Sequence, residues 1–231
     1  MTAPHHVVVV GGGVLGTSAA AHIAETGSRV TLVTDAPSMT HTSAASFAWV
    51  NANAVDSAYA EFKAAARAEH VRHGSGEWFV QTGSDLDDVV TKEDGYVDVE
   101  RFIAAHRERL VKAGGALHVR AHVQRLDRRA DKIIVEYTAS DAAPEAPKTA
   151  TAKPDTAMLE ADTVVLAAGS GTAELARSFG ADTRRIGTAT GPRGFLARVR
   201  LDHGLTSIRS VNGMQLRPDG PGILAAQSLT L

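Results

Sequence analysis

Residues 6–35 read HVVVVGGGVLGTSAAAHIAETGSRVTLVTD, and the order of residue types predicts a strand, a turn, a helix and a second strand. Residues 7–10 are a continuous run of valine, which is typical of a strand buried on both faces. The helix is expected over residues 14–26, rich in alanine and stopped by Gly27, and the next strand over residues 29–33. Together these segments form a βαβ unit, whose crossover is right-handed.

Three glycines between the first strand and the helix fit the pattern G-x-G-x-x-G: Gly11, Gly13 and Gly16. In this pattern the first glycine allows a tight turn, the second lets the backbone approach a pyrophosphate, and the third lets helix and strand pack closely. The N–H groups and the positive dipole end of the helix that begins near Val14 would then hold a diphosphate. The segment therefore predicts dinucleotide binding, with a tight βα turn that holds no ligand as the alternative.

A dinucleotide site of this kind places an acidic residue at the end of the second strand, where it binds the ribose hydroxyls. Here the strand is followed by Thr34 and then Asp35, so the acid comes one residue late. Because side chains alternate between faces, a shift of one residue points Asp35 away from the ribose unless the strand bends. Thr34 is the alternative donor, and Asp35 before Ala36-Pro37 is also typical of a turn.

Later segments predict further helices over residues 56–73, 98–113 and 173–179, and strands over residues 116–126, 132–138 and 163–168. The two adjacent strands 116–126 and 132–138 indicate a meander. Residues 139–156 are rich in Ala, Pro, Thr and Lys and are expected to form a surface loop. Residues 185–231 alternate short apolar strands with Gly/Pro turns.

The composition excludes several classes of protein. The 231 residues include no cysteine, which rules out disulfides, cysteine-based zinc sites and iron–sulfur clusters. The balance of 24 Lys+Arg against 26 Asp+Glu gives no basic field for nucleic acid. No apolar segment reaches the roughly 20 residues of a membrane span, no signal peptide is expected, and the cytoplasm is the expected location.

Four segments resemble the FAD-dependent amino-acid oxidase and dehydrogenase family, which includes glycine and sarcosine oxidases and D-amino-acid dehydrogenases. The first is the glycine pattern, and the second is TSAASFAWVNAN at residues 42–53, similar to the segment that runs along the flavin. The third is ADTVVLAAG at residues 161–169, similar to the strand that returns to the cofactor pyrophosphate. The fourth combines GPRGFL at residues 191–196 with LRPDG at residues 216–220, similar to strands of the substrate domain.

The resemblance implies an α/β fold: a Rossmann-type FAD-binding parallel sheet with a β-meander, plus an incomplete antiparallel substrate domain. It implies an FAD-binding domain over residues 1–75 and 96–182, and a partial substrate domain over residues 76–95 and 183–231. Val123 would hold the adenine through its backbone, and Ala168 and Gly169 would close the site. The implied FAD contacts are Gly11, Gly13, Val14, Leu15, Gly16, Thr34, Asp35, Thr42, Ser43, Ser46, Phe47, Ala48, Val123, Ala168 and Gly169. Helix capping by Thr42 and Ser43 is the alternative for those two residues.

The activity implied by the resemblance is oxidation of the C–N bond of an amino acid or secondary amine by hydride transfer to the flavin. No catalytic residue and no metal ligands are predicted, and Arg217 is expected to pair with Asp219 in a surface turn. Members of this family continue beyond the point where this sequence stops, which suggests a complementary chain, a truncation or a remnant. Two other functions stay open: a noncatalytic flavin-binding or partner subunit of a split enzyme, and an NAD(P)-linked Rossmann oxidoreductase.

Overall fold

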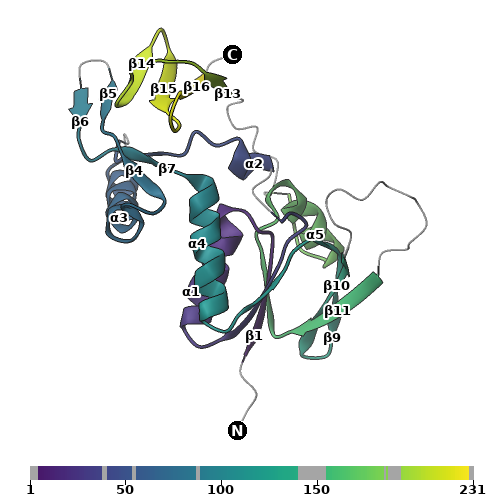
Figure 1. The fold of residues 1–231 in the computed structure, drawn as a ribbon. Coiled ribbons are helices and arrows are strands. Elements are labelled where there is room, and N and C mark those ends of the chain that lie inside the picture. Colours follow the sequence, from purple (N-terminus) through teal and green to yellow (C-terminus); the bar gives the residue numbers. More distant parts are fainter. Residues whose placement is uncertain are drawn as a thin grey trace. The chain divides into compact units, whose positions relative to one another are not determined.

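The computed structural model describes residues 5–37, 41–53, 56–86, 89–139, 155–184, 186 and 194–228. The chain divides into two compact units, one made of residues 1–43 and 103–189 and the other of residues 44–102 and 190–231. Figure 1 shows the elements of both units.

The first unit is built on a four-stranded parallel sheet. Its strands lie in the order β12 (Thr163–Leu166), β1 (His6–Val10), β2 (Arg29–Val33) and β8 (Ala116–His118). Helix α1 (Val14–Glu25) connects β1 to its parallel neighbour β2. The strand–turn–helix–strand order predicted from residues 6–35 is therefore confirmed.

Strand β1 is buried on both faces, as its valine run predicts. Val7 and Val9 pack in one cluster with three alanines of α1, namely Ala20, Ala21 and Ala24. Val8 and Val10 pack in the other cluster with residues of the meander strands. Figure 1 shows α1 and the meander on opposite sides of β1. The small alanine side chains let the helix lie close to the sheet, which places the start of α1 directly after the glycine turn.

The meander consists of β9 (Ala121–Arg129), β10 (Lys132–Ala139) and β11 (Asp155–Ala161), with β10 in the middle. The single strand predicted over residues 116–126 is wrong, because Arg120 has a φ of +54° and separates β8 from β9. Strand β11 begins inside the segment predicted as a loop, so the loop prediction is wrong at residues 155 and 156. Residues 140–154 of the predicted loop lie outside the described residues.

Three helical segments complete the first unit or link it to the second. The short helix α2 spans His41–Ala44, and a 3-10 turn at Gly169–Gly171 leads into α5 (Thr172–Ser178). Helix α4 (Val99–Lys112) begins among residues of the second unit and ends among residues of the first. The helices predicted over residues 98–113 and 173–179 are confirmed to within about one residue at each end.

The second unit contains helix α3 (Ser57–Gly74) and two sheets. The smaller sheet has the antiparallel order β3 (Trp49–Val50), β7 (Gly95–Val97) and β4 (Phe79–Gln81). The larger sheet has the order β13 (Phe195–Arg200), β16 (Ile223–Ser228), β15 (Met214–Pro218), β14 (Ile208–Val211), β5 (Ser84–Leu86) and β6 (Val89–Thr91). The strands predicted in the C-terminal segment are thus present within residues 194–228.

A buried carboxylate ties the elements of the second unit together. Asp94 has no exposed surface and accepts hydrogen bonds from Arg67 on α3 (2.9 Å) and from the Ser84 hydroxyl on β5 (2.7 Å). The indole N–H of Trp49 on β3 donates to the same carboxylate at 3.3 Å. A charge buried in this way is stable only when it is paired and hydrogen-bonded, and this carboxylate is both.

The parallel sheet of the first unit and the sheets of the second, antiparallel except for the β14–β5 pair, confirm the predicted α/β class. The functional domain limits stay a prediction, since compactness alone does not assign a function to either unit.

Candidate functional site

The glycine turn after β1 has a geometry that only glycine allows at two of its positions. Gly11 has a φ of +110°, and a Cβ added there would lie 2.2 Å from the carbonyl oxygen of Ala167. A Cβ added at Gly16 would lie 1.8 Å from the carbonyl oxygen of Gly11. The first glycine therefore makes the turn beside the chain leaving β12, and the third lets α1 cross close to it.

Helix α1 starts without a side-chain cap of its own. Gly13 is the N-cap residue and makes no side-chain hydrogen bond, and the first turn carries no acidic residue. The Ser43 hydroxyl accepts a hydrogen bond from the Val14 N–H at 3.3 Å, and a Cβ added at Gly13 would lie 2.9 Å from that oxygen. Since the first amides of a helix lack partners within the helix, this end of α1 is suited to an anion.

Three more predicted contacts lie close to this turn or extend from it. Leu15, in the first turn of α1, is 77% exposed, which is unusual for a large apolar side chain next to a buried sheet. Ala168 and Gly169 follow β12, where the Ala167 N–H donates to the Val10 carbonyl at 2.8 Å. The turn of the glycine pattern and the end of β12 therefore come together, as the resemblance implied.

At the end of β2 the structure points Thr34, and not the acid, toward the glycine turn. Thr34 is buried, and its Oγ1 would lie 2.4 Å from a Cβ added at Gly12. Asp35 is exposed on the surface. The place of the expected acid is therefore filled by a hydroxyl, and a ribose contact by Asp35 stays a prediction.

Arg107 on α4 is a candidate residue that the sequence analysis missed. Its Nη2 would lie 3.0 Å from a Cβ added at Gly12, and its guanidinium donates to the carbonyl oxygens of Pro37 (2.5 Å) and Ala36 (3.4 Å). Its Nε is buried without a hydrogen-bond partner, and no carboxylate of the described residues lies within 4 Å. Burial lowers the pKa of this guanidinium.

A signal for Arg107 was present in the sequence. It lies four residues after Ile103 and three before Leu110, two apolar residues of the buried stripe of α4. A cation on the apolar face of an amphipathic helix is uncommon unless it contacts a polar group. The position of Arg107 within the stripe therefore indicates such a contact.

The other predicted contacts of the first unit are dispersed. Thr42, in α2, is exposed, whereas its neighbour Ser43 contacts the start of α1. Val123 is buried in β9 and pairs with Tyr137 of β10. The contact of either Thr42 or Val123 with a cofactor stays a prediction.

In the second unit, the predicted contacts Ser46, Phe47 and Ala48 form a tight turn. The Ser46 hydroxyl accepts from the Ala48 N–H at 3.0 Å, and Ala48 has a φ of +54°, a left-handed conformation that L-residues seldom adopt. Phe47 is buried against Ile208 and Ala225 of the larger sheet. Such a conformation persists only when its surroundings hold it in place.

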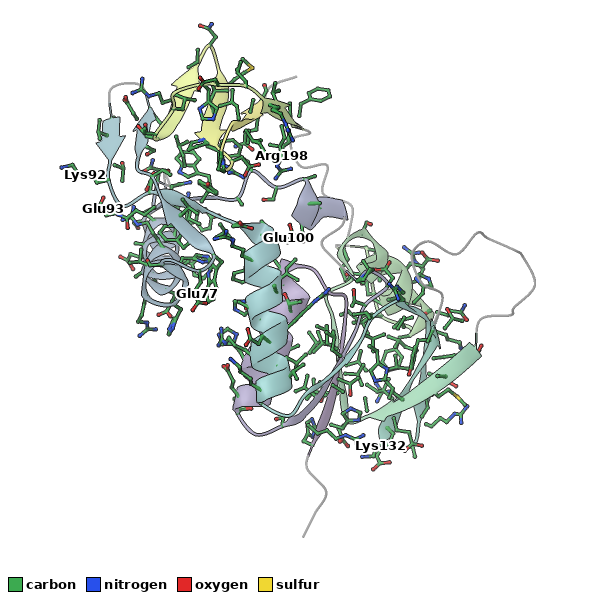
Figure 2. The ribbon with its side chains drawn as sticks, viewed as in Figure 1. Glu77, Lys92, Glu93, Glu100, Lys132 and Arg198 are labelled. Carbon is green, nitrogen blue, oxygen red and sulfur yellow. The ribbon has the colours of Figure 1, made fainter. Side chains whose placement is uncertain are left out.

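Two arginines hold this turn by its carbonyl oxygens. Arg217 donates from Nε to the Phe47 carbonyl (2.7 Å), and Arg198 donates from Nη1 to the Ala44 carbonyl (2.9 Å). Asp219 pairs with both arginines at 2.6 Å, and Figure 2 labels Arg198. We refer to Arg198, Arg217 and Asp219 as the arginine clamp.

The environment of Arg217 differs from the predicted one. The pairing with Asp219 is present, but Arg217 is 2% exposed and stacks 4.0 Å from the centre of the Tyr96 ring, so the surface location is wrong. Burial lowers the pKa of its guanidinium, while the charge of Asp219 opposes that shift. Hydrogen bonds to main-chain carbonyls, invisible in the sequence, draw this arginine inward.

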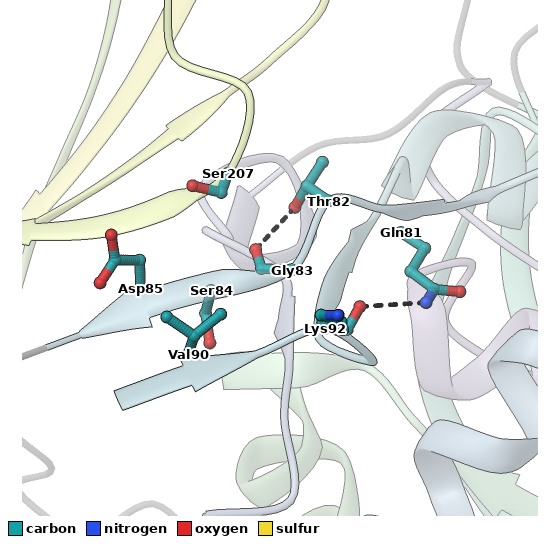
Figure 3. Close-up of a pocket in the computed structure, with 8 residues that line it drawn as sticks. All are labelled: Gln81, Thr82, Gly83, Ser84, Asp85, Val90, Lys92 and Ser207. Carbon is teal, nitrogen blue, oxygen red and sulfur yellow. Dashed lines mark hydrogen bonds between the residues drawn. The ribbon is translucent and has the colours of Figure 1, made fainter. Parts of the chain in front are cut away.

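Two open cavities lie in the second unit. The larger, of about 610 Å³, is formed by residues 81–85, Val90, Lys92 and Ser207, and Figure 3 shows these side chains. The smaller, of about 450 Å³, is formed by residues 46–49, Asn51, Asn53, Lys63, Gln215 and Gln227. Only the smaller cavity includes predicted cofactor contacts.

The part of the chain that the structure describes contains neither a metal-binding cluster nor a membrane-spanning helix. No cluster of three or more His, Asp or Glu side chains there has the arrangement of a metal site. No described helix has both the length and the apolar character needed to cross a membrane.

Comparisons with known proteins agree with this arrangement. Residues 6–87 match the family model described as FAD dependent oxidoreductase. No curated protein matches the sequence.

Solved structures match nearly the whole chain. Glycine oxidase from Geobacillus kaustophilus matches with a TM-score of 0.69 at 17% identity, over 96% of this chain and 70% of that one. L-amino acid deaminase from Proteus vulgaris matches with a TM-score of 0.73 at 12% identity, over 99% of this chain and 61% of that one. L-proline dehydrogenase from P. horikoshii matches with a TM-score of 0.67 at 13% identity, over 98% of this chain and 70% of that one.

These values establish a shared fold, and this chain spans about two thirds of the length of those structures. The expected resemblance to FAD-dependent oxidoreductases is therefore confirmed: residues 6–87 match the model of that family, whose cofactor is FAD.

Proposed function

We propose that this chain binds FAD at the glycine turn and takes part in oxidising the C–N bond of an amino acid or secondary amine. One observation carries the proposal: α1 begins at a glycine without a side-chain cap, at a turn too crowded for any Cβ at Gly11 or Gly16. Such a turn brings main-chain amides to an anion, as a dinucleotide diphosphate requires.

The residues near the turn fit this cofactor. A Cβ at Gly12 or Gly13 would fill the space that the hydroxyls of Thr34 and Ser43 border, so small residues and donors surround the position for the diphosphate and ribose. When bound, FAD supplies the hydride-accepting centre of the oxidation. The chain binds the diphosphate and ribose of the cofactor through the helix start, Thr34 and Ser43.

The nature of the substrate is inferred from the comparisons. The glycine oxidase, L-amino acid deaminase and L-proline dehydrogenase that share the fold are all named for amino acids. We assign the same class of substrate here, and no residue of the described chain is assigned a catalytic role. This chain spans 61–70% of the length of those proteins, and a complementary chain is proposed as its partner in turnover.

The test is purification of the full chain with and without added FAD. The proposal predicts a yellow protein with flavin absorbance, and oxidation of amino acids once the complementary chain is present. Flavin binding without turnover, even with the complementary chain, would favour a noncatalytic subunit of a split enzyme. A colourless protein that takes up no FAD would refute the proposal.

One observation favours a second candidate, an NADP-linked Rossmann oxidoreductase. Thr34 replaces the acid at the end of β2, and the Arg107 guanidinium lies beside it without a carboxylate partner among the described residues. A hydroxyl and an arginine at this position are suited to a ribose 2′-phosphate. Uptake of NADPH in preference to FAD by the purified chain would support this candidate.

A further inference from the structure

The smaller cavity of the second unit contains one cation and no acid. Lys63 of α3 and four side-chain amides border it, and no carboxylate is among its lining residues. Its remaining wall is the turn at residues 46–49, which includes the three residues expected beside the flavin. We refer to this space as the Lys63 cavity.

The Lys63 ammonium is held in place by two hydrogen bonds, which occupy two of its three donors. Its Nζ donates to the Asn51 side-chain oxygen and to the Asn53 carbonyl, both at 2.5 Å. The Asn51 oxygen also accepts from the Asn53 N–H at 3.1 Å, so the loop that holds the ammonium is itself ordered. An ammonium has three donors, and one therefore remains for a ligand.

The charge of Lys63 has no counterpart within the described residues. No described Asp or Glu lies within 4 Å of Nζ, whereas Arg67, Arg198 and Arg217 of this unit each pair with a carboxylate. The side chain is half-buried, with Nζ 5.7 Å from the centre of the Tyr59 ring. A cation attracts an anion, and two hydrogen bonds to the 51–53 loop already hold this one at the cavity wall.

Two amides on the facing strands add complementary groups. Gln215 on β15 and Gln227 on β16 are paired in register, and the Gln227 NH2 donates to the Gln215 oxygen at 2.5 Å. Whichever of the two amides donates, the pair retains one free carbonyl oxygen and NH groups that can still donate. The cavity thus presents a cation and donors for a carboxylate, and an acceptor for an amino group.

We propose that Lys63 recognises the carboxylate of a small amino-acid ligand in this cavity, with the Gln215–Gln227 pair contacting the amino group. The inference rests on the proposed function for the identity of the ligand, since the cavity wall includes residues 46–48, the segment expected beside the flavin. A lysine that served only to tether the 51–53 loop would need neither an acid-free cavity nor a facing amide pair. Lys63 is thus a specificity-determining residue that separates acids from neutral analogues.

The experiment compares propionate with propionamide, which differ mainly in charge. Full-length protein labelled with 15N, with FAD added, is titrated with each probe while the side-chain amide signals of Asn51, Gln215 and Gln227 are followed. The expected result is shifts of these signals and a preference for propionate of about tenfold, close to the value of one charge-assisted hydrogen bond. Added salt should reduce the preference, because the attraction is electrostatic.

Three variants separate recognition from tethering. Lys63→Gln should remove the preference for propionate, and Lys63→Arg should retain it because the charge is kept. Lys92→Gln is the matched control, since Lys92 lines the other cavity (Figure 3) and should change nothing. Absence of propionate binding, or a preference unchanged in Lys63→Gln, would overturn the inference.

The same samples distinguish this inference from the proposed function. Flavin absorbance of the bound cofactor reports the proposed function independently of the probes. A protein that binds propionate through Lys63 but takes up no FAD contradicts the proposed function alone. A protein that binds FAD but shows no preference dependent on Lys63 contradicts the inference alone.

Discussion

Arg107 and Thr34 make the ribose end of the candidate site unusual at the level of single residues. The usual acid would accept hydrogen bonds from ribose hydroxyls, whereas a guanidinium only donates. Among the described residues the buried Nε of Arg107 has no partner, and an unpaired buried donor costs free energy. A ligand oxygen at this position would recover that cost, so Arg107 is expected to strengthen dinucleotide binding.

Replacing Arg107 tests this expectation. Arg107→Leu should weaken FAD binding by about tenfold, the effect of one charge-assisted hydrogen bond, and make binding less sensitive to salt. The free energy of unfolding without FAD should stay equal or rise, because the unpartnered Nε is removed. Quenching of FAD fluorescence gives the affinity, and Arg101→Leu, exposed on the first turn of α4, is the control. Equal losses in both variants would contradict a specific role for Arg107.

At the scale of elements, the arginine clamp explains how an alanine keeps a left-handed conformation. The turn at residues 44–48 has few apolar contacts apart from Phe47, and three of its carbonyl oxygens accept from Arg198 or Arg217. Asp219 pairs with both arginines and fixes their directions. The segment expected beside the flavin is therefore held in place by side chains of strands β13 and β15.

The two arginines of the clamp should differ in their contribution to stability. Arg217→Met removes a buried partner and leaves the Phe47 carbonyl unsatisfied, which is expected to cost about 3 kcal/mol of unfolding free energy. Arg198→Met, at a half-exposed position, should cost less than about 1 kcal/mol. Urea unfolding followed by tryptophan emission reports on this unit, because Trp49 and Trp78, both tryptophans of the chain, lie in it. Similar costs for the two variants would show that burial of Arg217 does not matter.

Strand β1 carries a buried histidine that makes stability depend on pH. His6 contacts the Glu160 carbonyl (2.6 Å) through Nδ1 and the Thr31 hydroxyl (2.9 Å) through Nε2, and burial lowers its pKa below the ordinary 6.5. The unfolded chain therefore binds a proton more readily than the folded one. Stability should be retained above about pH 6.5 and fall as the pH drops below it.

A pair of histidine variants measures this effect. The thermal unfolding temperature, followed by circular dichroism, should fall less between about pH 7 and pH 5 in His6→Gln than in the wild type. His5→Gln, whose side chain is 58% exposed, is the control and should follow the wild-type curve. An unchanged pH dependence in His6→Gln would mean that other groups, such as the buried His70, dominate.

For the molecule as a whole, the sequence correctly predicts those helices, strands and turns that short local patterns encode. The valine run, the glycine turn and the alanine-rich helix were correct because each follows from short-range sterics and burial. Strand β11 was missed because the exposed Met158 interrupts the alternation of apolar and polar residues, and the strand gains its place by pairing with β10. Arg107 and Arg217 were missed or misplaced because their partners are carbonyl oxygens about 70 and 170 residues away.

The central claim is that the glycine turn holds the diphosphate of FAD, and Gly13→Ala tests it most directly. The added Cβ would lie 2.9 Å from the Ser43 hydroxyl oxygen, which can rotate away, so the fold should survive while the approach of a diphosphate is blocked. Gly171→Ala is the matched control, since its Cβ would meet only the Ala168 Cβ at 3.8 Å. Titration with FAD, followed by fluorescence quenching, should show binding to the wild type and Gly171→Ala, and at least tenfold weaker binding to a folded Gly13→Ala. Equal FAD affinity in all three proteins would contradict the account.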